Sequence, residues 1–174
     1  NDYVAVNIFK PLGMERSTFV QPLPEAIAGD MSNGYRLASD VETVSFEVVV
    51  PFPAGSLTST ATDMSKFMLA HLNEGKLGEA QILKPETAKL MHSRLFGLDE
   101  KANAMAYGFY EESRNGLRII GHGGDTIAFH SDLHLIPEKR VGFFISYIRA
   151  GKVEVAGRST LWEAFLERDF DADP

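Results

Sequence analysis

The sequence contains no cysteine among its 174 residues. This absence excludes disulfide bonds, thiolate metal ligands and cysteine nucleophiles together. Long hydrophobic runs are also missing. The longest, from Val141 to Ile148, has the length of a strand and falls far short of the roughly 18 apolar residues that span a bilayer. We therefore expect no membrane span in this chain.

Basic residues are comparatively few, with 17 Lys and Arg against 24 Asp and Glu and a net charge of -7. This balance argues against nucleic-acid binding, which needs a basic face. The chain has neither an initiator Met nor a signal peptide. Its first residues already show the apolar stripe of a helix, formed by Val4, Ile8 and Phe9. We therefore expect the chain to be a piece of a longer protein.

The first part of the sequence predicts helices and loops. A helix covers residues 1–10 and is stopped by Pro11, and residues 15–53 form a long connection. A capping box, T-x-x-D at Thr60 and Asp63, predicts a helix over 60–74. A second helix starts at Pro85 and runs to about residue 93. We expect two histidines on these helices to be exposed, His71 and His92.

The later part shows the period of strands. Asn115-Gly116 is a hairpin signal between strands predicted at 106–111 and 117–120. The glycines that follow interrupt the pattern, residues 127–136 alternate as a strand does, and 141–148 is apolar on both faces, which favours a central strand. A final helix over 153–168 has an inward stripe of Leu161, Trp162, Phe165 and Leu166.

This order predicts an α+β fold, with helices first, then an antiparallel sheet, then one helix. We expect residues 1–174 to form a single unit. Its helical and loop part covers 1–104, and its sheet with the C-terminal helix covers 105–174.

Four stretches, taken together and in order, carry a family resemblance. They are Ile8 to Met14 with Ser17 to Phe19; Asn33 to Tyr35; Pro53 to Asp63; and Tyr107 to Phe109 followed by Gly121 to Gly124, Phe129 to Ser131 and Pro137. They resemble the conserved segments of β-lactamase-related serine hydrolases, a group that includes class C β-lactamases, D-alanyl-D-alanine carboxypeptidases and esterases. The resemblance implies the C-terminal portion of a β-lactamase/transpeptidase-like fold.

The resemblance also implies a site. Such enzymes use a serine in Ser-x-x-Lys, a Tyr-x-Asn or Ser-x-Asn, and a strand motif K-T-G. The first motif is absent from this chain, and the second is absent from any plausible place. His122-Gly123-Gly124 stands at the position of K-T-G. His122 would then be catalytic, Gly123 and Gly124 would admit the substrate, and the Asp125 N–H would donate to the oxyanion. Tyr35 would either reach the substrate or anchor the long loop.

Other readings of these residues are weaker. H-G-G also occurs in α/β-hydrolases, but those need a G-x-S-x-G elbow that this sequence lacks. His130 and His134 would lie about 13 Å apart on a strand, too far to share one metal ion. We therefore expect no metal and no organic cofactor.

The resemblance implies acyl-enzyme hydrolysis of an amide or ester: a β-lactam, a D-Ala peptide or an ester. This chain alone is expected to be inactive, because its nucleophile would lie upstream. The alternative is a non-catalytic homologue that binds a peptidoglycan-like peptide or a protein partner. The missing N-terminal segment, or a second copy of the chain, would cover an apolar face on the sheet and on helix 60–74. The resemblance favours a periplasmic or secreted protein.

Overall fold

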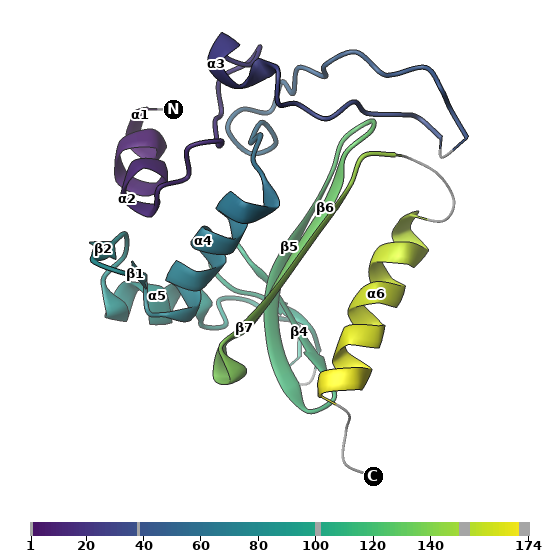
Figure 1. Cartoon of the computed structure of the whole chain (residues 1–174). Coiled ribbons are helices and arrows are strands. Elements are labelled where there is room, and N and C mark those ends of the chain that lie inside the picture. Colours follow the sequence, from purple (N-terminus) through teal and green to yellow (C-terminus); the bar gives the residue numbers. More distant parts are fainter. Residues whose placement is uncertain (1, 38, 100–101, 150–153, 171–174) are drawn as a thin grey trace.

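A five-stranded antiparallel sheet with helices on both of its faces organises the computed structural model (Figure 1). The structure describes residues 2–37, 39–99, 102–149 and 154–170. Helix α4 (Ala61–Leu72) lies on one face of the sheet, and helix α6 (Glu154–Asp169) lies on the other. The predicted α+β fold, with its helices before the sheet and one helix after it, is confirmed.

The N-terminal helical segment joins three short pieces: α1 (Asp2–Val4), the π-helical turn η1 (Ala5–Phe9) and α2 (Lys10–Leu12). Pro11 was predicted to stop this helix, but the helix continues to Leu12 and ends at Gly13, which adopts a left-handed φ of 64°. Proline tolerates helical φ and lacks only the N–H, and a π-helical turn directly before it is one way for the backbone to adjust.

The long connection up to residue 60 contains one short helix, α3 (Glu25–Ala28), and is otherwise irregular, as predicted. An isolated bridge between Thr18 and Thr58 joins the two ends of this connection, and one between Tyr35 and Arg149 ties it to the residues after β7. Eight of its large apolar side chains are exposed: Val20, Leu37, Val41, Phe46, Val48, Val50, Phe52 and Leu57. On the predicted apolar face, Leu69 of α4 and Met105 and Tyr110 of the sheet are exposed.

Helix α4 begins at the predicted cap. The Thr60 hydroxyl accepts a hydrogen bond from the Asp63 N–H at 3.1 Å. The buried Asp63 carboxylate accepts from the Arg16 N–H at 2.8 Å and from the Ser17 hydroxyl at 2.9 Å, and it pairs with the Lys66 ammonium at 3.0 Å. Burial alone would raise the pKa of Asp63, but these donors lower it below its usual value. Asp63 therefore fixes the loop after α2 to the start of α4.

A two-stranded ribbon, β1 (Lys76–Leu77) with β2 (Ala80–Gln81), joins α4 to α5 (Pro85–His92). His71 and His92, predicted to be exposed, are not. His71 is 3% exposed, and its Nδ1 lies 3.0 Å from Nε2 of the half-buried His92. Both rings pack against Phe109, a contact between distant segments that the local helical pattern cannot reveal.

The main sheet has the strand order β3-β4-β5-β6-β7. Its strands are β3 (Ala104–Met105), β4 (Tyr110–Arg114), β5 (Leu117–Asp125), β6 (His130–Ile136) and β7 (Val141–Tyr147), with the 3-10 turn η2 (Pro137–Lys139) between the last two. The predicted hairpin is confirmed, because Asn115 and Gly116 both have positive φ and connect Arg114 directly to its partner Leu117.

Three strand predictions need correction. Of the strand predicted at 106–111, only residues 110 and 111 belong to a strand, β4, because residues 106–109 connect β3 to β4 through a turn at Gly108, whose φ is 81°. The glycines after Ile120 do not interrupt the strand, because β5 runs through them to Asp125. Strand β7, predicted to be central, is the last strand in the sheet order among the described residues. Its two apolar faces reflect the helices: Phe144 packs toward α4 and Phe143 toward α6.

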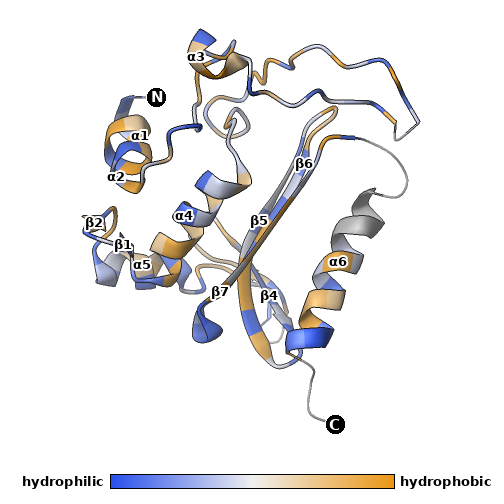
Figure 2. Ribbon diagram, in the orientation of Figure 1, coloured by the Kyte–Doolittle hydropathy of each residue, from blue (hydrophilic) through white to orange (hydrophobic). Residues whose placement is uncertain are grey.

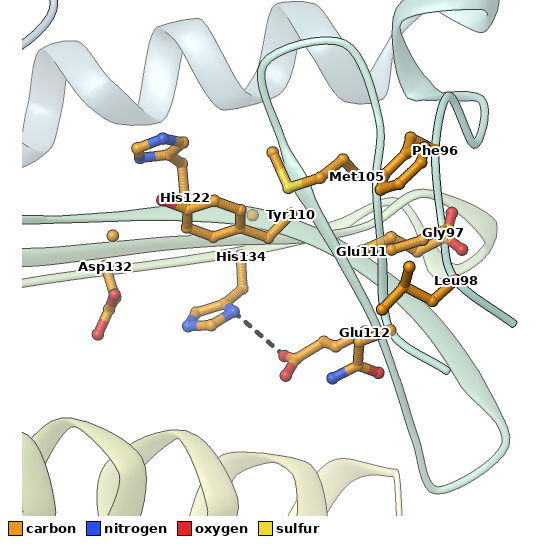
Figure 3. A pocket seen from close by; sticks show the side chains of 14 residues that line it. Phe96, Gly97, Leu98, Met105, Tyr110, Glu111, Glu112, His122, Asp132 and His134 are labelled. Carbon is orange, nitrogen blue, oxygen red and sulfur yellow. Dashed lines mark ion pairs between the residues drawn. The ribbon is translucent and has the colours of Figure 1, made fainter. Parts of the chain in front are cut away.

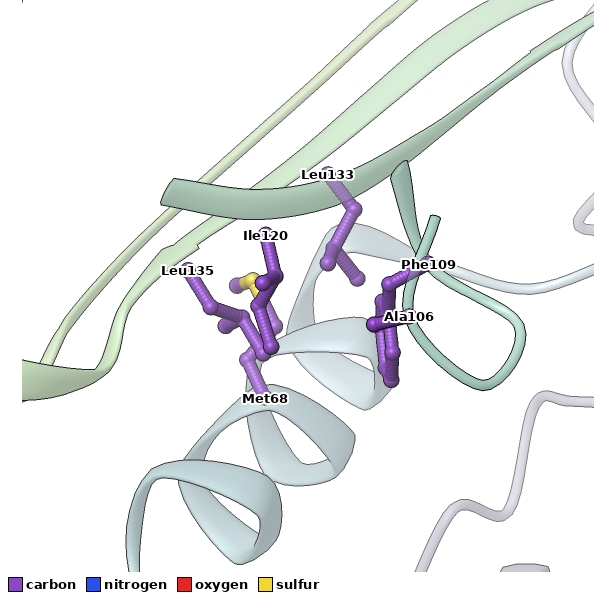
Figure 4. Close-up of a cluster of buried hydrophobic side chains, with 6 residues drawn as sticks. All are labelled: Met68, Ala106, Phe109, Ile120, Leu133 and Leu135. Carbon is purple, nitrogen blue, oxygen red and sulfur yellow. The ribbon is translucent and has the colours of Figure 1, made fainter. Parts of the chain in front are cut away.

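Two clusters of buried side chains fill the two sides of the sheet. On the α4 side they are Met68, Ala106, Phe109, Ile120, Leu133 and Leu135 (Figure 4). On the α6 side they are Leu117, Ile119, Ile136, Trp162 and Leu166. Figure 2 shows the matching hydrophobic residues along α4 and the described part of α6. Within the described ranges, no helix has both the length and the apolar character needed to cross a membrane.

Helix α6 docks through fewer residues than predicted. Trp162 is 4% exposed and stacks on the His134 ring at 4.2 Å, whereas its neighbour Leu161 is 49% exposed. The predicted inward position of Leu161 is therefore wrong. One turn later, Phe165 and Leu166 continue the buried face.

These two neighbours provide a matched test of how α6 is held. We expect Trp162→Ala to lower the free energy of unfolding by about 3–5 kcal/mol, because it removes a buried aromatic side chain. Leu161→Ala should change it by no more than about 0.5 kcal/mol. Urea denaturation followed by circular dichroism measures both values, and equal losses would contradict this packing.

The buried histidine pair predicts an acid-sensitive fold. Burial, and then the charge of His92, lowers the pKa of His71 to about 4. The unfolded chain then binds the proton more tightly, so stability is complete above the unfolded pKa of about 6.5 and falls as the pH drops towards 4, by up to about 3 kcal/mol. His71→Phe should flatten this dependence in urea titrations at several pH values. Phe109→Leu, which alters the same cluster without removing an ionisable group, should keep the dependence at lower overall stability.

Candidate functional site

The edge of β5 around His122 is the candidate site. Strand β4 pairs with β5 only as far as Gly121, opposite Tyr110, whereas β6 pairs with β5 up to Asp125. Residues 122–125 therefore extend past the end of β4. Beyond that point, one edge of the strand is paired with β6, and β4 does not cover the other.

Backbone alternation determines which groups face that edge. In the turn after β5, the Thr126 N–H donates to the Phe129 carbonyl at 2.8 Å. Because antiparallel strands direct successive N–H groups to opposite edges, the N–H groups of Gly124 and His122 point toward β6. The N–H groups of Gly123 and Asp125 point to the opposite edge of β5. This is the edge on which the N–H groups of Leu117 and Gly121 point toward β4.

A cavity of about 510 Å³ opens beside this edge (Figure 3). It is lined by Phe96, Gly97, Leu98, Asn103, Ala104, Met105, Tyr110, Glu111, Glu112, Gly121, His122, Gly123, Asp132 and His134. The exposed His122 ring stacks on the Tyr110 ring, with 4.5 Å between centroids. Figure 3 shows His122 on one side of the sheet, and Glu112, Asp132 and His134 on the side that faces α6.

The α6 side of the cavity carries an ionised carboxylate. Glu112 Oε1 lies 3.5 Å from His134 Nδ1 and accepts a hydrogen bond from the Trp162 indole at 3.3 Å. The hydrogen bond with His134 lowers the pKa of Glu112, burial opposes it, and Arg114 adds to the lowering. The indole and the imidazole thus hold this side chain at the cavity wall.

A second carboxylate, that of Glu111, lies on the opposite face of β4 and is buried. It pairs with the Arg94 guanidinium at 3.1 Å and with Arg118, which also donates to the His92 carbonyl. Two guanidinium groups therefore compensate one carboxylate. This network joins the segment after α5 to β4 and β5, and so supports the far wall of the cavity.

The structure brings together most of the site residues predicted from the sequence. His122 and Gly123 line the cavity, and Gly124 and Asp125 follow on the same strand. The Asp125 side chain accepts a hydrogen bond from His130 at 2.6 Å. Tyr35 lies elsewhere: its N–H donates to the Ile148 carbonyl at 2.9 Å beyond β7.

That location agrees with the loop-anchor reading of Tyr35, whose ring lies 4.6 Å below the Arg149 guanidinium. A substrate-binding role for Tyr35 stays a prediction. Sequence reasoning missed all three carboxylates that line the cavity, among them Glu112 and Asp132 on the side that faces α6. The period-2 alternation of β4 and β6 carries the signal that could have placed them on one face.

Metal binding has little support in the geometry. His130 and His134, considered together in the sequence, engage different carboxylates, those of Asp125 and Glu112. Among the described residues, no group of three His, Asp or Glu side chains is arranged to hold a metal ion.

The glycines of β5 differ in how much space they have, which gives a testable contrast. A Cβ at Gly121 would collide with the Leu133 carbonyl of β6, whereas one at Gly124 would meet nothing within 4 Å. We expect Gly121→Ala to destabilise the fold by about 1–3 kcal/mol and Gly124→Ala to stay within about 0.5 kcal/mol of the wild type. Urea titration measures both free energies of unfolding. A larger loss of stability for Gly124→Ala than for Gly121→Ala would contradict this difference in space.

Curated relatives resemble most of this chain. Beta-lactamase-like protein 1 of Dictyostelium discoideum is 26% identical over 168 residues, covering 83% of this chain and 26% of that protein. Putative beta-lactamase-like 1 of Homo sapiens is 24% identical over 145 residues, covering 82% of this chain and 28% of that protein. The chain thus spans about a quarter of the length of these relatives.

Solved structures share the fold. A class C beta-lactamase superposes with a TM-score of 0.71 at 16% identity, covering 92% of this chain and 48% of that one. The octameric penicillin-binding protein homologue from Pyrococcus abyssi gives a TM-score of 0.67 at 20% identity, covering 93% of this chain and 37% of that one. The family profile described as Beta-lactamase matches residues 1–163. Since that match covers most of the sequence, the chain belongs to the beta-lactamase family.

Proposed function

We propose that this chain is part of a serine hydrolase that cleaves an amide or ester through an acyl-enzyme. The observation that carries the proposal is the edge of β5 past Gly121, where the N–H groups of Gly123 and Asp125 point away from β6 beside a cavity. Backbone donors fixed on a strand can stabilise the negative oxygen that develops on a substrate carbonyl.

His122 supplies the side chain at this edge. It is exposed and lies over Tyr110, so a substrate bound along β5 would meet its imidazole directly. Imidazole can donate or accept a proton near neutral pH, which suits a group that assists proton transfer to or from a reacting atom. We assign His122 that role, and we assign the Asp125 N–H the role of oxyanion donor.

The nucleophile is proposed to lie outside these residues. The chain contains no Ser-x-x-Lys. Its one Ser-x-Asn, Ser113 to Asn115, lies in the β4–β5 hairpin, where the Asn115 amide donates to the Phe170 carbonyl. That hairpin is at the opposite end of β5 from Asp125. This separation supports a nucleophile contributed by the rest of a longer protein.

The exposed apolar residues of the long connection support the same arrangement. Eight exposed large apolar side chains on one connecting segment favour a contact with another part of a protein. We propose that the remainder of the parent protein covers it.

Fluorophosphonate labelling of the full-length parent protein tests the proposal. The expected label is on a serine outside residues 1–174, mapped by mass spectrometry of the labelled peptide. A label on a serine within this chain would contradict the assignment of the nucleophile. A folded parent that takes no label would instead favour a non-catalytic homologue that binds a peptide or protein.

Two substitutions in the same parent refine the test. His122→Ala should lower kcat by about 10²-fold or more, because it removes a proton-handling group. Asp125→Ala should have a much smaller effect, since the proposed donor is the backbone N–H, which alanine retains. A larger loss from Asp125→Ala than from His122→Ala would reverse the two roles.

A further inference from the structure

We propose that two pieces of the long connection, residues 33–35 and 44–47, form a clamp that fixes the turn after β5 and thereby positions the Asp125 N–H. Glu47 and Gly34 are the positioning residues of this clamp. The inference rests on the proposed function, because it concerns the donor assigned there to the oxyanion. Three contacts join the clamp to the sheet: a hydrogen bond, a close approach to the turn and an anchor beyond β7.

The end of β5 depends on the turn that follows it. The pairing of β4 with β5 ends at Gly121, and the strand partner of Asp125 is His130 of β6. Residues 126–129 form the turn between these two partners. It is closed by a hydrogen bond from the N–H of its first residue to the carbonyl of its last, at 2.8 Å. The direction of the Asp125 N–H is therefore sensitive to any displacement of the turn.

Glu47 holds the tip of this turn from outside the sheet. Its half-buried side chain accepts a hydrogen bond from the Ile127 N–H at 2.7 Å, across 80 residues of sequence. Hydrogen bonds to an ionised carboxylate are shorter and stronger than those between neutral groups. Because the donor is a backbone group, this bond fixes the main chain of the turn and leaves the Ile127 side chain exposed.

Gly34 allows the connection to lie directly against the same turn. A Cβ at this position would approach the Ala128 Cβ to 2.7 Å and the Phe129 ring to 3.0 Å. Ala128 is 3% exposed, and its Cβ moves only with its backbone. A side chain at residue 34 would therefore displace the turn, whereas a glycine leaves it in place.

Both contacts belong to one frame. The Val44 N–H donates to the Gly34 carbonyl at 2.8 Å, which ties the two pieces of the clamp together. The Tyr35 N–H donates to the Ile148 carbonyl at 2.9 Å and fixes the clamp beyond β7. Figure 1 shows the long connection passing over the turn between β5 and β6. The clamp thus holds the turn against the sheet from a third side.

Substitutions of Glu47 in the full-length parent test the clamp. Glu47→Ala removes the acceptor and should lower kcat for p-nitrophenyl acetate by about ten-fold, with KM changed less than about two-fold, because an oxyanion donor acts only at short range. Glu47→Gln keeps a carbonyl oxygen on the same stem and should restore kcat to within about three-fold of the wild type. Each kcat is counted per fluorophosphonate-labelled site, so that unfolded molecules do not contribute. The control is Glu42→Ala, an exposed carboxylate of the same connection, which should alter neither constant.

Two glycines of the connection provide a second, matched pair. Gly34→Ala should lower kcat about as much as Glu47→Ala does, because the added methyl group displaces the turn. Gly29→Ala should leave kcat unchanged, since a Cβ there meets nothing within 4 Å. Equal effects of the two glycine variants, or a Glu47→Gln variant as slow as Glu47→Ala, would overturn the proposal.

Hydrogen exchange separates the clamp from the proposed function. In the parent, Glu47→Ala should speed amide exchange in peptides covering residues 125–130 by at least about five-fold, and leave peptides covering 114–117 unchanged. If the parent takes no fluorophosphonate label, the hydrolase fails, and exchange alone decides on the clamp: faster exchange supports it and unchanged exchange refutes it. A labelled parent in which Glu47→Ala hydrolyses the ester at the wild-type rate refutes the clamp alone.

Discussion

The register of the β4–β5 hairpin is the constraint on which the site depends. A two-residue turn at Asn115 and Gly116 pairs Arg114 with Leu117 and thereby determines, by alternation, the direction of every later group in β5. It directs the His122 side chain to one face and the Asp125 N–H away from β6. A slip of one residue would exchange both assignments. Since both turn residues have positive φ, few other residue pairs would preserve this turn.

Much of the fold could be predicted from local sequence patterns, because its determinants lie close together in the chain. The cap at Thr60, the helix start at Pro85 and the hairpin at Asn115 each depend on a few neighbouring residues, and the structure has all three. The errors concern contacts between distant segments. The sequence alone does not show that α5 brings His92 to His71, or that the turn of α6 at Trp162 leaves Leu161 in solvent.

The candidate site divides in the same way. His122, Gly123, Gly124 and Asp125 are contiguous on one strand and adjoin or belong to one of the stretches that carry the family resemblance, so they could be singled out together. The cavity wall combines β4, β6 and the segment after α5, and its carboxylates become neighbours only once the sheet forms. The sequence left two roles open for Tyr35, and its contact with Arg149 depends on a residue that is distant in the chain.

The stacking of Trp162 on His134 has a consequence for spectroscopy. Trp162 is the sole tryptophan of the sequence, and its indole N–H donates to Glu112, a residue of the cavity wall. Indole emission responds to neighbouring charge and to hydrogen bonding, so the intrinsic fluorescence of the protein reports from one known position. The chain thus carries its own optical probe of the cavity, with no label attached and no background from a second fluorophore of the same kind.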